Sequence, residues 1–395
     1  MLKEFDFDQP LSRKQTNSVK YDIIHLSADL QQDPNVIPMW VADMDLPTHP
    51  AIAQAISDVA LKGIYGYSNR PQSYQQAIIQ WYQTHYNYTI EEPLLAFSPC
   101  VMTSIAYLLE TLVSAGEEVV IQTPVYPEFA QAIKDRGAIV VENPLMEKEG
   151  KYVIDFIDLE AKLATAKAMI LCSPHNPVGR VWSPEELTKL ASLIQRYQIP
   201  LIADEIHADL TLYGHQHYPF ITQVPQLQGL IYTLLSASKT FNLASLHASS
   251  LIFPDKNQRI AFDNWLKKWH INRNNIFSLA GVEKAYQVGY PWLQALRTYL
   301  EDNIAYMEAR VIKELPKLKV MSIEATYLLW VDCRGLNLDQ EALKEFFYQE
   351  AKVIVNMGYT FGTGGEGFVR FNIATQRVNI QQALDQLVIA YQKRF

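Results

Sequence analysis

Cysteine is scarce in this chain of 395 residues, which holds only Cys100, Cys172 and Cys333. No two of them stand close enough for a CxxC pair, so the sequence offers neither a zinc framework nor a disulfide scaffold. We therefore expect no metal site. Sparse cysteine of this kind is typical of a protein from a reducing compartment.

Long apolar runs are also absent, since no stretch approaches the ~18 consecutive apolar residues that a membrane helix needs. The charged start MLKEFDFDQP lacks the apolar core of a signal peptide. Lys and Arg number 34 against 42 Asp and Glu, and 34 − 42 gives the formal charge of −8. This balance argues against a sequence-independent grip on nucleic acid but leaves a local phosphate site open. We expect a soluble, cytoplasmic protein whose partners include neither nucleic acid nor membrane.

Length and hydrophobic pattern together predict two lobes. A single core stops growing at roughly 250–300 residues, which is fewer than the 395 of this chain. In its middle part, short apolar runs alternate with amphipathic stretches, a pattern that predicts crossover units around a mainly parallel sheet. The expected strands share a short apolar run and cover residues 117–123, 138–142, 167–172, 199–204, 231–236 and 248–253.

Two helix signals support this alternation. Ser183 as N-cap, Pro184 at the first helical position and Glu186 three residues after the cap predict the start of a helix. Gly137 stands where a C-cap glycine would follow a helix over residues 127–136. Both helices connect predicted strands, as crossover units require.

The pattern changes after about residue 285. A long helix from Pro291 towards Leu315 is expected there, followed by half-buried strands in VMSIEATYLLWVDC and a helix near residues 340–350. A Gly-rich loop and the strand FVRFNIA come last. This order is typical of a separate α+β lobe.

Polar clusters follow three of the expected strands, and ligands in open α/β sheets bind beyond the carboxyl ends of strands. The clusters are SPHNPVG at 173–179, DEIH at 204–207 and SASKTFN at 236–242. Each by itself has an ordinary structural interpretation, as a turn, a helix cap or a solvated charge. Together they place an Asn, an Asp and a Lys at successive strand ends, which is a much rarer combination.

These three residue types meet the chemical needs of pyridoxal phosphate. Lys239 can bond to an aldehyde as a Schiff base, and an anionic Asp204 can hold a pyridine nitrogen protonated. The amide of Asn176 can bond the phenolic oxygen of such a ring. Ser236 and Ser238 lie on the same turn as the lysine, where their hydroxyls suit phosphate oxygens.

The chain resembles the fold-type I pyridoxal-phosphate enzymes, the aspartate aminotransferase superfamily, over essentially its whole length. Within them it is most similar to the cystathionine β-lyase (C–S lyase) group of MalY/PatB type. The matching segments are PMWVADMD at 38–45, YGYSNRP at 65–71, QTPVYPEF at 122–129, SPHNPVGRVW at 173–182, ADEIHADL at 203–210, SASKTFNLA at 236–244 and GFVRFNIA at 367–374.

The resemblance implies an α/β fold of the aspartate aminotransferase type. Its large, cofactor-binding domain would span residues 46–285, with a mainly parallel seven-stranded sheet between helices. A small α+β domain would be assembled from residues 1–45 and 286–395.

The same resemblance implies roles around the cofactor ring. Lys239 would carry the cofactor and then move the substrate α-proton, while Asp204 would pair with the ring nitrogen. Asn176 would bond the ring oxygen, and His207 would lie near that oxygen. Tyr126 would stack on the ring, although an ordinary packed aromatic is the alternative for this residue.

At the phosphate end, the resemblance implies contacts from the helix start at Cys100, Val101 and Met102. Tyr67 would reach the phosphate from a neighbouring subunit, so the site would be shared across a homodimer. Tyr67 could also be an ordinary packed aromatic.

At the substrate end, Arg370 would bind the α-carboxylate of an amino acid through a two-pronged contact that lysine cannot reproduce. Asn176, Val41 and Ala42 would complete this side, where residues 40–43 cover the substrate. An Arg within an apolar strand is hard to explain otherwise, because a buried and unpaired Arg is costly.

Three residues depart from the family pattern. Cys100 stands where the phosphate-cradling turn normally carries Gly, so it must adopt a permissible backbone angle or the phosphate must shift. Ser245 follows Ala244 where Gly is usual, and His247 stands where many aminotransferases place a phosphate-binding Arg. Since histidine is partly charged near neutrality, we hypothesise that phosphate binding depends on pH.

A late run, GTGGEG at 362–367, superficially resembles a nucleotide-binding loop. It precedes a strand rather than a helix, and no Lys-Ser/Thr follows it, so neither a Walker nor a dinucleotide motif is present. We expect a flexible loop that leads to Arg370.

The resemblance implies a lyase that cleaves the Cβ–S bond of cystathionine or related cysteine S-conjugates, giving a thiol, pyruvate and ammonia. An L-amino-acid aminotransferase is the alternative, because Lys239, Asp204, Asn176 and Arg370 serve both reactions. A second alternative, which the departures above support, is a cofactor-binding regulatory protein with little turnover.

Overall fold

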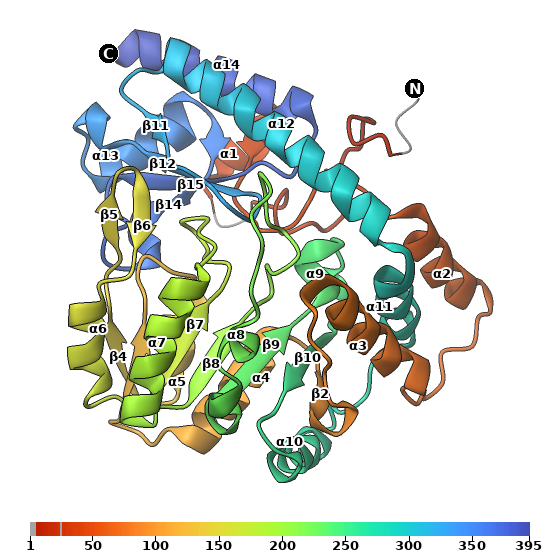
Figure 1. Ribbon diagram of the computed structural model, residues 1–395. Helices are drawn as coiled ribbons and strands as arrows, with labels where there is room; N and C mark the ends of the chain where they lie inside the picture. The colour runs from red at the N-terminus through yellow and green to blue at the C-terminus, as the bar shows by residue number, and fades with distance from the viewer. Residues whose placement is uncertain (1–4, 24–25) are drawn as a thin grey trace.

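Figure 1 shows a computed structural model of the chain, which describes residues 5–23 and 26–395. At its centre lies a seven-stranded sheet in the order β2-β10-β9-β8-β7-β3-β4. Its strands are β2 (Leu95–Ser98), β3 (Glu118–Ile121), β4 (Ile139–Glu142), β7 (Ala168–Cys172), β8 (Leu201–Asp204), β9 (Ile231–Leu235) and β10 (Ser249–Ile252). Strands β9, β8, β7, β3 and β4 pair in parallel, whereas β10 is antiparallel to both of its neighbours. The predicted mainly parallel seven-stranded sheet is confirmed.

All six strands expected from the sequence are present, and β2 is the addition. Its four residues, LAFS, are fully buried, and a short apolar run cannot be assigned to a strand by periodicity alone. Antiparallel pairing with β10 is what makes these residues a strand.

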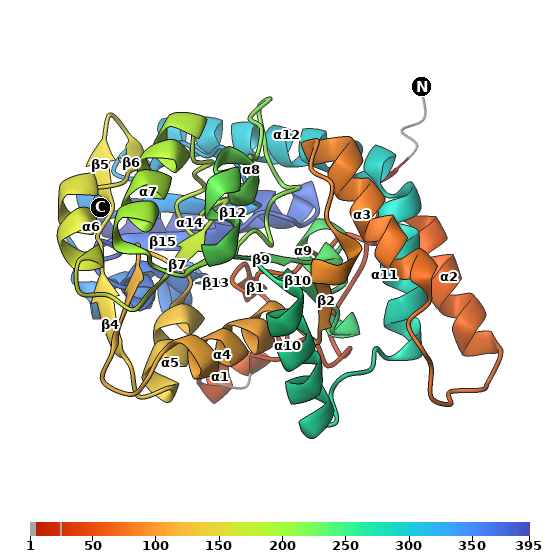
Figure 2. The same cartoon turned by 60° about the horizontal axis from the view of Figure 1, so that its bottom comes forward.

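Helices cover both faces of this sheet, as Figures 1 and 2 show from different sides. One face carries α4 (Val101–Leu112) and α5 (Pro127–Asp135), and the other carries α6 (Phe156–Leu163), α7 (Pro184–Tyr197) and α8 (Phe220–Gln223). The predicted capping box is present, because the Ser183 hydroxyl accepts from Glu186 N and the Glu186 carboxylate accepts from Ser183 N. Gly137 follows α5 with φ +74°, as a C-cap glycine should.

The remaining elements around the seven-stranded sheet are shorter or lie at its edges. The remaining elements are α2 (Pro50–Leu61), α3 (Gln72–Tyr86), η1 (Glu92–Leu94), β5 (Met146–Lys148), β6 (Lys151–Val153), η2 (Pro225–Leu230), α9 (Ala237–Thr240), η3 (Ala244–Leu246), α10 (Lys256–Lys268) and α11 (Ile276–Val288). Among them, helix α11 packs on both α2 and α3.

A four-stranded antiparallel sheet, in the order β11-β12-β15-β14, forms the second layer. The long helix α12 and helix α14 pack together above it (Figure 1). The elements of this part are α1 (Ala28–Gln32), β1 (Ile37–Pro38), α12 (Tyr290–Glu314), β11 (Lys319–Val320), β12 (Leu328–Asp332), η4 (Arg334–Leu336), α13 (Gln340–Glu345), η5 (Phe346–Glu350), β13 (Val353–Ile354), β14 (Asn356–Met357), η6 (Gly358–Phe361), β15 (Phe368–Asn372) and α14 (Arg377–Arg394). The predicted α+β character of this part is confirmed.

Segments from the N-terminal and C-terminal parts of the chain pair in this second layer. Strand β1 pairs in parallel with β13, which brings residues 37–38 beside residues 353–354. The Gly-rich run 362–367 is the expected loop before β15. Gly365 is required there, because a Cβ at this position would lie 2.0 Å from the carbonyl oxygen of Gly358. This close approach shapes the turn from which the strand carrying Arg370 departs.

The described residues contain neither a candidate membrane-spanning helix nor a candidate metal-binding cluster. No helix in residues 5–23 and 26–395 is long and apolar enough to cross a membrane. Over the same residues, no group of three or more His, Cys, Asp and Glu side chains could hold a metal ion.

Candidate active site

Three neighbouring parallel strands bring the predicted polar clusters together. The register of β7, β8 and β9 places Cys172 beside Asp204 and Asp204 beside Leu234. Their carboxyl ends open on a cavity of about 740 Å³ that residues of both layers line. The sequence-predicted residues that line it are Val41, Ala42, Cys100, Val101, Met102, Tyr126, Asn176, Asp204, His207, Ser236, Ser238, Lys239 and Arg370.

Lys239 lies on the short helix α9, which begins at Ser236. The Ser236 hydroxyl caps this helix by accepting from Ser238 N at 3.1 Å. The Lys239 amine donates to the carbonyl oxygen of Ala42 at 2.6 Å. Burial and the positive charge of Arg370 lower the pKa of Lys239 to about 8. A substantial fraction of this amine is therefore neutral and nucleophilic near physiological pH.

Asp204 ends strand β8 at the floor of the cavity. Its carboxylate accepts from Ile206 N at 3.1 Å, and burial raises its pKa to about 7. The next residue, Glu205, points elsewhere, because its carboxylate bonds His217 at 3.1 Å and Phe220 N at 2.9 Å. Asp204 is thus the carboxylate of this pair that faces the cavity, where a cationic N–H would stabilise its charge.

His207 lies beside Lys239, and its Nδ1 has no hydrogen-bond partner among the described residues. Burial, with the positive charges of Lys239 and Arg370, lowers the pKa of His207 to about 3. The ring is therefore neutral throughout the physiological range, with one buried nitrogen left for a ligand.

Arg370 enters the cavity from β15 of the second layer. It donates to Asn176 Oδ1 at 2.9 Å, to Asn356 Oδ1 at 2.6 Å and to the Trp40 carbonyl at 3.1 Å. Among the described residues no carboxylate pairs with it and its Nε has no partner. Burial lowers its pKa to about 10. The guanidinium also lies over the Phe361 ring, 4.9 Å from its centroid. A buried guanidinium that has no carboxylate partner among the described residues is a ready receptor for a carboxylate.

The backbone at the start of α4 shows how Cys100 is accommodated in place of glycine. Cys100 is the N-cap residue with φ −157° and ψ 165°, an extended conformation that any residue adopts. Its Sγ lies 3.2 Å from Thr103 Oγ1. Glycine is therefore not needed here, and the first N–H groups of the helix stay available for an anion.

Ser236 and Ser238, the predicted phosphate-binding hydroxyls, line the same cavity as the start of α4. The Ser236 hydroxyl lies 2.9 Å from both Ser238 Oγ and the Ala248 carbonyl oxygen. Ser245 and His247 are exposed and line the same cavity. Nothing in the structure tests the predicted pH dependence at His247, which stays a hypothesis.

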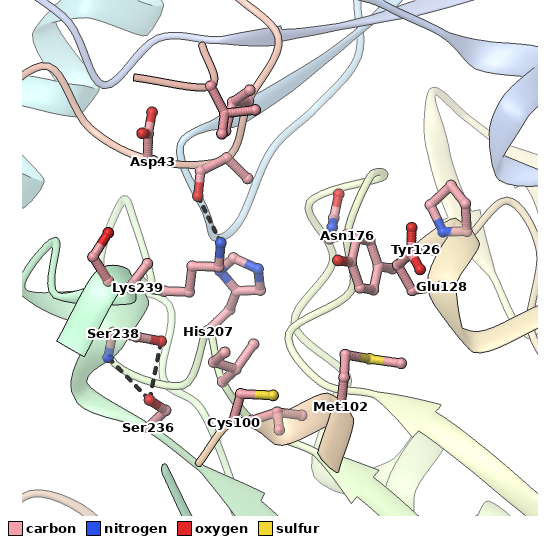
Figure 3. Close-up of a pocket in the computed structure, with 18 of the residues that line it drawn as sticks. Asp43, Cys100, Met102, Tyr126, Glu128, Asn176, His207, Ser236, Ser238 and Lys239 are labelled. Atoms are coloured by element: carbon pink, nitrogen blue, oxygen red, sulfur yellow. Dashed lines mark hydrogen bonds between the residues drawn. The ribbon is translucent and has the colours of Figure 1, made fainter. Parts of the chain in front are cut away.

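Figure 3 shows how these side chains surround an open space. Lys239 and His207 lie on one side of it, and Asn176 and Tyr126 lie on the other. Cys100 and Met102 lie at the end where Ser236 and Ser238 are also found. A flat ring can therefore occupy the space with an anionic group at the α4 end.

Tyr67 differs from the other predicted residues because it does not line the cavity. It lies in the loop between α2 and α3 and is 97% exposed. Leu61 and Ile64 in the same region are 80% and 76% exposed. An exposed apolar loop of this kind is a candidate contact surface for a second chain.

The sequence predicted residues 40–43 on the substrate side but not the basic side chains that pair with the adjoining carboxylates. Arg13 pairs with Asp43 at 2.6 Å and with Asp45 at 2.9 Å, and the fully buried Lys20 pairs with Asp45 at 2.6 Å. Arg13 lines the cavity, as does Asn356. No local signal could have found them, since single polar residues in irregular segments carry no periodicity.

The lowered pKa of His175 predicts that the unfolding free energy of the protein decreases in mild acid. Burial lowers its pKa from an ordinary 6.5 to about 4, and its Nε2 lies 2.9 Å from the Pro124 carbonyl oxygen. A histidine with a lowered pKa contributes stability above the unfolded pKa and loses it as pH falls towards the folded pKa. Between pH 7.5 and pH 5 this group should cost about 2 kcal/mol of unfolding free energy.

In His175→Gln, the decrease of the unfolding free energy over this pH range should be smaller by that amount, measured by urea unfolding. His215→Gln, at an exposed histidine, is the matched control and should retain the wild-type pH dependence. An unchanged pH dependence in His175→Gln would contradict the prediction.

Comparison with known proteins now identifies the class. The family model described as aminotransferase class I and II matches residues 34–387, and the chain belongs to this family. It is 38% identical to the cystathionine beta-lyase PatB of Bacillus subtilis strain 168 over 98% of this chain and 99% of that protein. It is 33% identical to the protein MalY of Escherichia coli K12, with 98% of each chain covered.

A solved structure agrees with these relatives. The crystal structure of cystalysin from Treponema denticola, which contains a pyridoxal 5'-phosphate cofactor, superimposes with a TM-score of 0.94 at 30% identity. The match covers 98% of this chain and 99% of that one. The predicted family and the aspartate aminotransferase-like fold are confirmed.

Proposed function

We propose that this chain is a pyridoxal-phosphate-dependent carbon–sulfur lyase. Its reaction is β-elimination of cystathionine or a related cysteine S-conjugate, which with water gives a thiol, pyruvate and ammonia. The observation that carries the proposal is the convergence of Lys239, Asp204 and Arg370 on one cavity. The similarity to PatB and cystalysin along nearly the full chain supports the lyase among the reactions of this family.

The residues present fit the proposed cofactor. Lys239 offers a partly buried amine for the aldehyde, and the buried carboxylate of Asp204 matches a protonated ring nitrogen. The unpaired Nδ1 of His207 and the amide of Asn176 are available to the ring oxygen. Backbone N–H groups of Val101 and Met102, with the hydroxyls of Ser236 and Ser238, would hold the phosphate.

The chain's own residues divide the work of elimination. Bound pyridoxal phosphate supplies the sink for the electron pair left on the substrate α-carbon. The Lys239 amine takes the α-proton, and its pKa near 8 leaves it partly in the basic form. Arg370 holds the α-carboxylate and so fixes the α-carbon relative to that amine. The Cβ–S bond then breaks, and the sulfur leaves as a thiolate.

A product assay on L-cystathionine tests the lyase. The expected result is release of pyruvate, ammonia and a thiol in equal amounts without added keto acid. Keto-acid-dependent amino exchange with no pyruvate would contradict the lyase and support the alternative function, an aminotransferase. Covalent cofactor attachment with no turnover of any amino acid would favour the regulatory protein instead.

We also propose the domain division 46–285 against 1–45 together with 286–395, although residues 1–4 and 24–25 lie outside the described part. The pairing of β1 with β13 supports joining the two chain ends in one domain. All three cysteines are free thiols, which supports the proposed cytoplasmic location.

A homodimer with shared active sites is the final part of the proposal. The exposed loop that carries Tyr67 supports it, because this aromatic side chain is 97% exposed and is not among the described residues that line the cavity of its own chain. We expect Tyr67 to reach the phosphate end of the partner's cavity.

Mixing two defective variants tests this arrangement. Lys239→Ala and Tyr67→Ala should each have low activity at limiting cofactor. After subunit exchange, a mixed dimer holds one site with both wild-type residues, so activity should recover to about a quarter of the wild-type value. No recovery, with mixed dimers demonstrated by native mass spectrometry, would contradict a shared site.

A further inference from the structure

Residues 40–43 form the wall of the cavity on the substrate side without belonging to a helix or a strand. Each of their four carbonyl oxygens accepts a hydrogen bond from a side chain. Arg370 and Asn372 of β15 donate to three of them, those of residues 40, 41 and 43. The second layer thus holds this wall in place through side chains.

The fourth carbonyl, that of Ala42, accepts two donors. One is the Lys239 amine at 2.6 Å, drawn as a dashed line in Figure 3, and the other is the Tyr327 hydroxyl at 3.0 Å. A carbonyl oxygen has two lone pairs and can accept both bonds. Lys239 must leave this carbonyl to bond the cofactor, whereas Tyr327 has no such reason to move.

Tyr327 is a fixed donor. It directly precedes β12, its side chain is 1% exposed, and the Ala42 carbonyl is the acceptor of its hydroxyl among the described residues. Burial and the nearby Asp43 carboxylate raise the pKa of Tyr327 far above its ordinary value, so the hydroxyl stays protonated. Tyr327 is not among the described residues that line the cavity. Its ring contacts the ring of His207 edge-on at 6.3 Å between centroids, whereas its hydroxyl reaches the site through Ala42.

We propose that Tyr327 positions the Lys239 amine for proton transfer by fixing the Ala42 carbonyl that receives this amine. The inference rests on the proposed function, in which Lys239 moves the α-proton. While Lys239 is bonded to the cofactor, Tyr327 keeps the carbonyl paired and in place. When substrate displaces the amine, the carbonyl accepts its N–H and restricts where the base can lie.

Tyr327→Phe removes the hydroxyl and keeps the ring. The matched control is Tyr348→Phe, since Tyr348 also donates from a largely buried hydroxyl to a backbone carbonyl, that of Val355 at 2.7 Å, outside the cavity. Turnover of L-cystathionine by the holoenzyme is compared with that of the α-deuterated substrate. In Tyr327→Phe, kcat should fall about 10-fold with KM within twofold, and the isotope effect should rise, because proton transfer becomes slower.

A second measurement does not depend on turnover. The rate at which pyridoxal phosphate attaches to the cofactor-free full chain should rise with pH as Lys239 loses its proton, with an expected midpoint near 8 in the wild type. Without Tyr327, the Ala42 carbonyl bonds the ammonium form more strongly. The midpoint should move upward by about 0.5 pH unit in Tyr327→Phe and stay in place in Tyr348→Phe.

Wild-type kcat, isotope effect and midpoint in Tyr327→Phe would overturn the inference. Equal losses in Tyr327→Phe and Tyr348→Phe would also overturn it, because any buried hydroxyl would then have the same effect. If the wild type releases no pyruvate while only Tyr327→Phe shifts the midpoint, the lyase proposal fails and the positioning role stands.

Discussion

Lys239→Ala is expected to lose turnover by at least about 10⁴-fold and to abolish covalent attachment of the cofactor. The amine is a partly buried nucleophile that lines the cavity, and its pKa near 8 suits both the attack on an aldehyde and the transfer of a proton. Alanine supplies neither function. Borohydride trapping followed by peptide mass spectrometry, together with pyruvate release, measures both losses.

Lys134→Ala, at an exposed lysine of α5, is the matched control and should behave as the wild type. The phosphate end and Asp204 are untouched in Lys239→Ala, so reversible, non-covalent cofactor binding should persist. Borohydride-stable label on another lysine with retained turnover would show that Lys239 is not the anchor.

Arg370→Lys should have the second largest effect, a decrease of kcat/KM by about 10²–10³-fold, or about 3–4 kcal/mol. Lysine keeps the charge but cannot reach Asn176, Asn356 and the Trp40 carbonyl while presenting two parallel N–H groups to a carboxylate. The variant should also loosen the wall at residues 40–43.

Substrate choice separates these two consequences. With an S-conjugate that lacks the α-carboxylate, the wild type and Arg370→Lys should react at similarly low rates, because the lost contact is absent in both. Arg310→Lys on α12, where the wild-type arginine pairs with Glu314 and Asp385, is the control for a change of arginine elsewhere. Equal kcat/KM of Arg370→Lys and the wild type on cystathionine would remove Arg370 from the substrate site.

Most strands of the central sheet and three residues of the candidate site could be predicted from the amino-acid sequence. The apolar runs predicted six of the seven strands of the central sheet, and parallel order at β7, β8 and β9 requires that their polar ends meet. Lys239, Asp204 and Asn176 could therefore be grouped from the sequence. The four-residue strand β2 was not predicted, because its assignment depends on pairing with β10, which lies far along the chain.

Other features depend on contacts that no local pattern encodes. Cys100 raised a doubt about the phosphate turn, and only its extended backbone angles removed it. Tyr327 and Ala42 are 285 positions apart in the chain, yet they share the hydrogen bond that organises the amine of Lys239. Arg13 likewise reaches Asp43 across irregular chain.

The alternating apolar runs and the polar strand ends by themselves determined the class of fold and brought the lysine, aspartate and asparagine to one edge of the sheet, and the scarcity of cysteine left no CxxC pair. These follow from short-range periodicity and from the geometry of parallel sheets, which every such chain obeys. The tertiary structure alone decided how buried each group is, and burial decides the pKa values near 8 for Lys239 and near 7 for Asp204. It also decided which carbonyls and amides hold Lys239 and Arg370 in place, because desolvation and long-range hydrogen bonds exist only once the two layers have closed on the cavity.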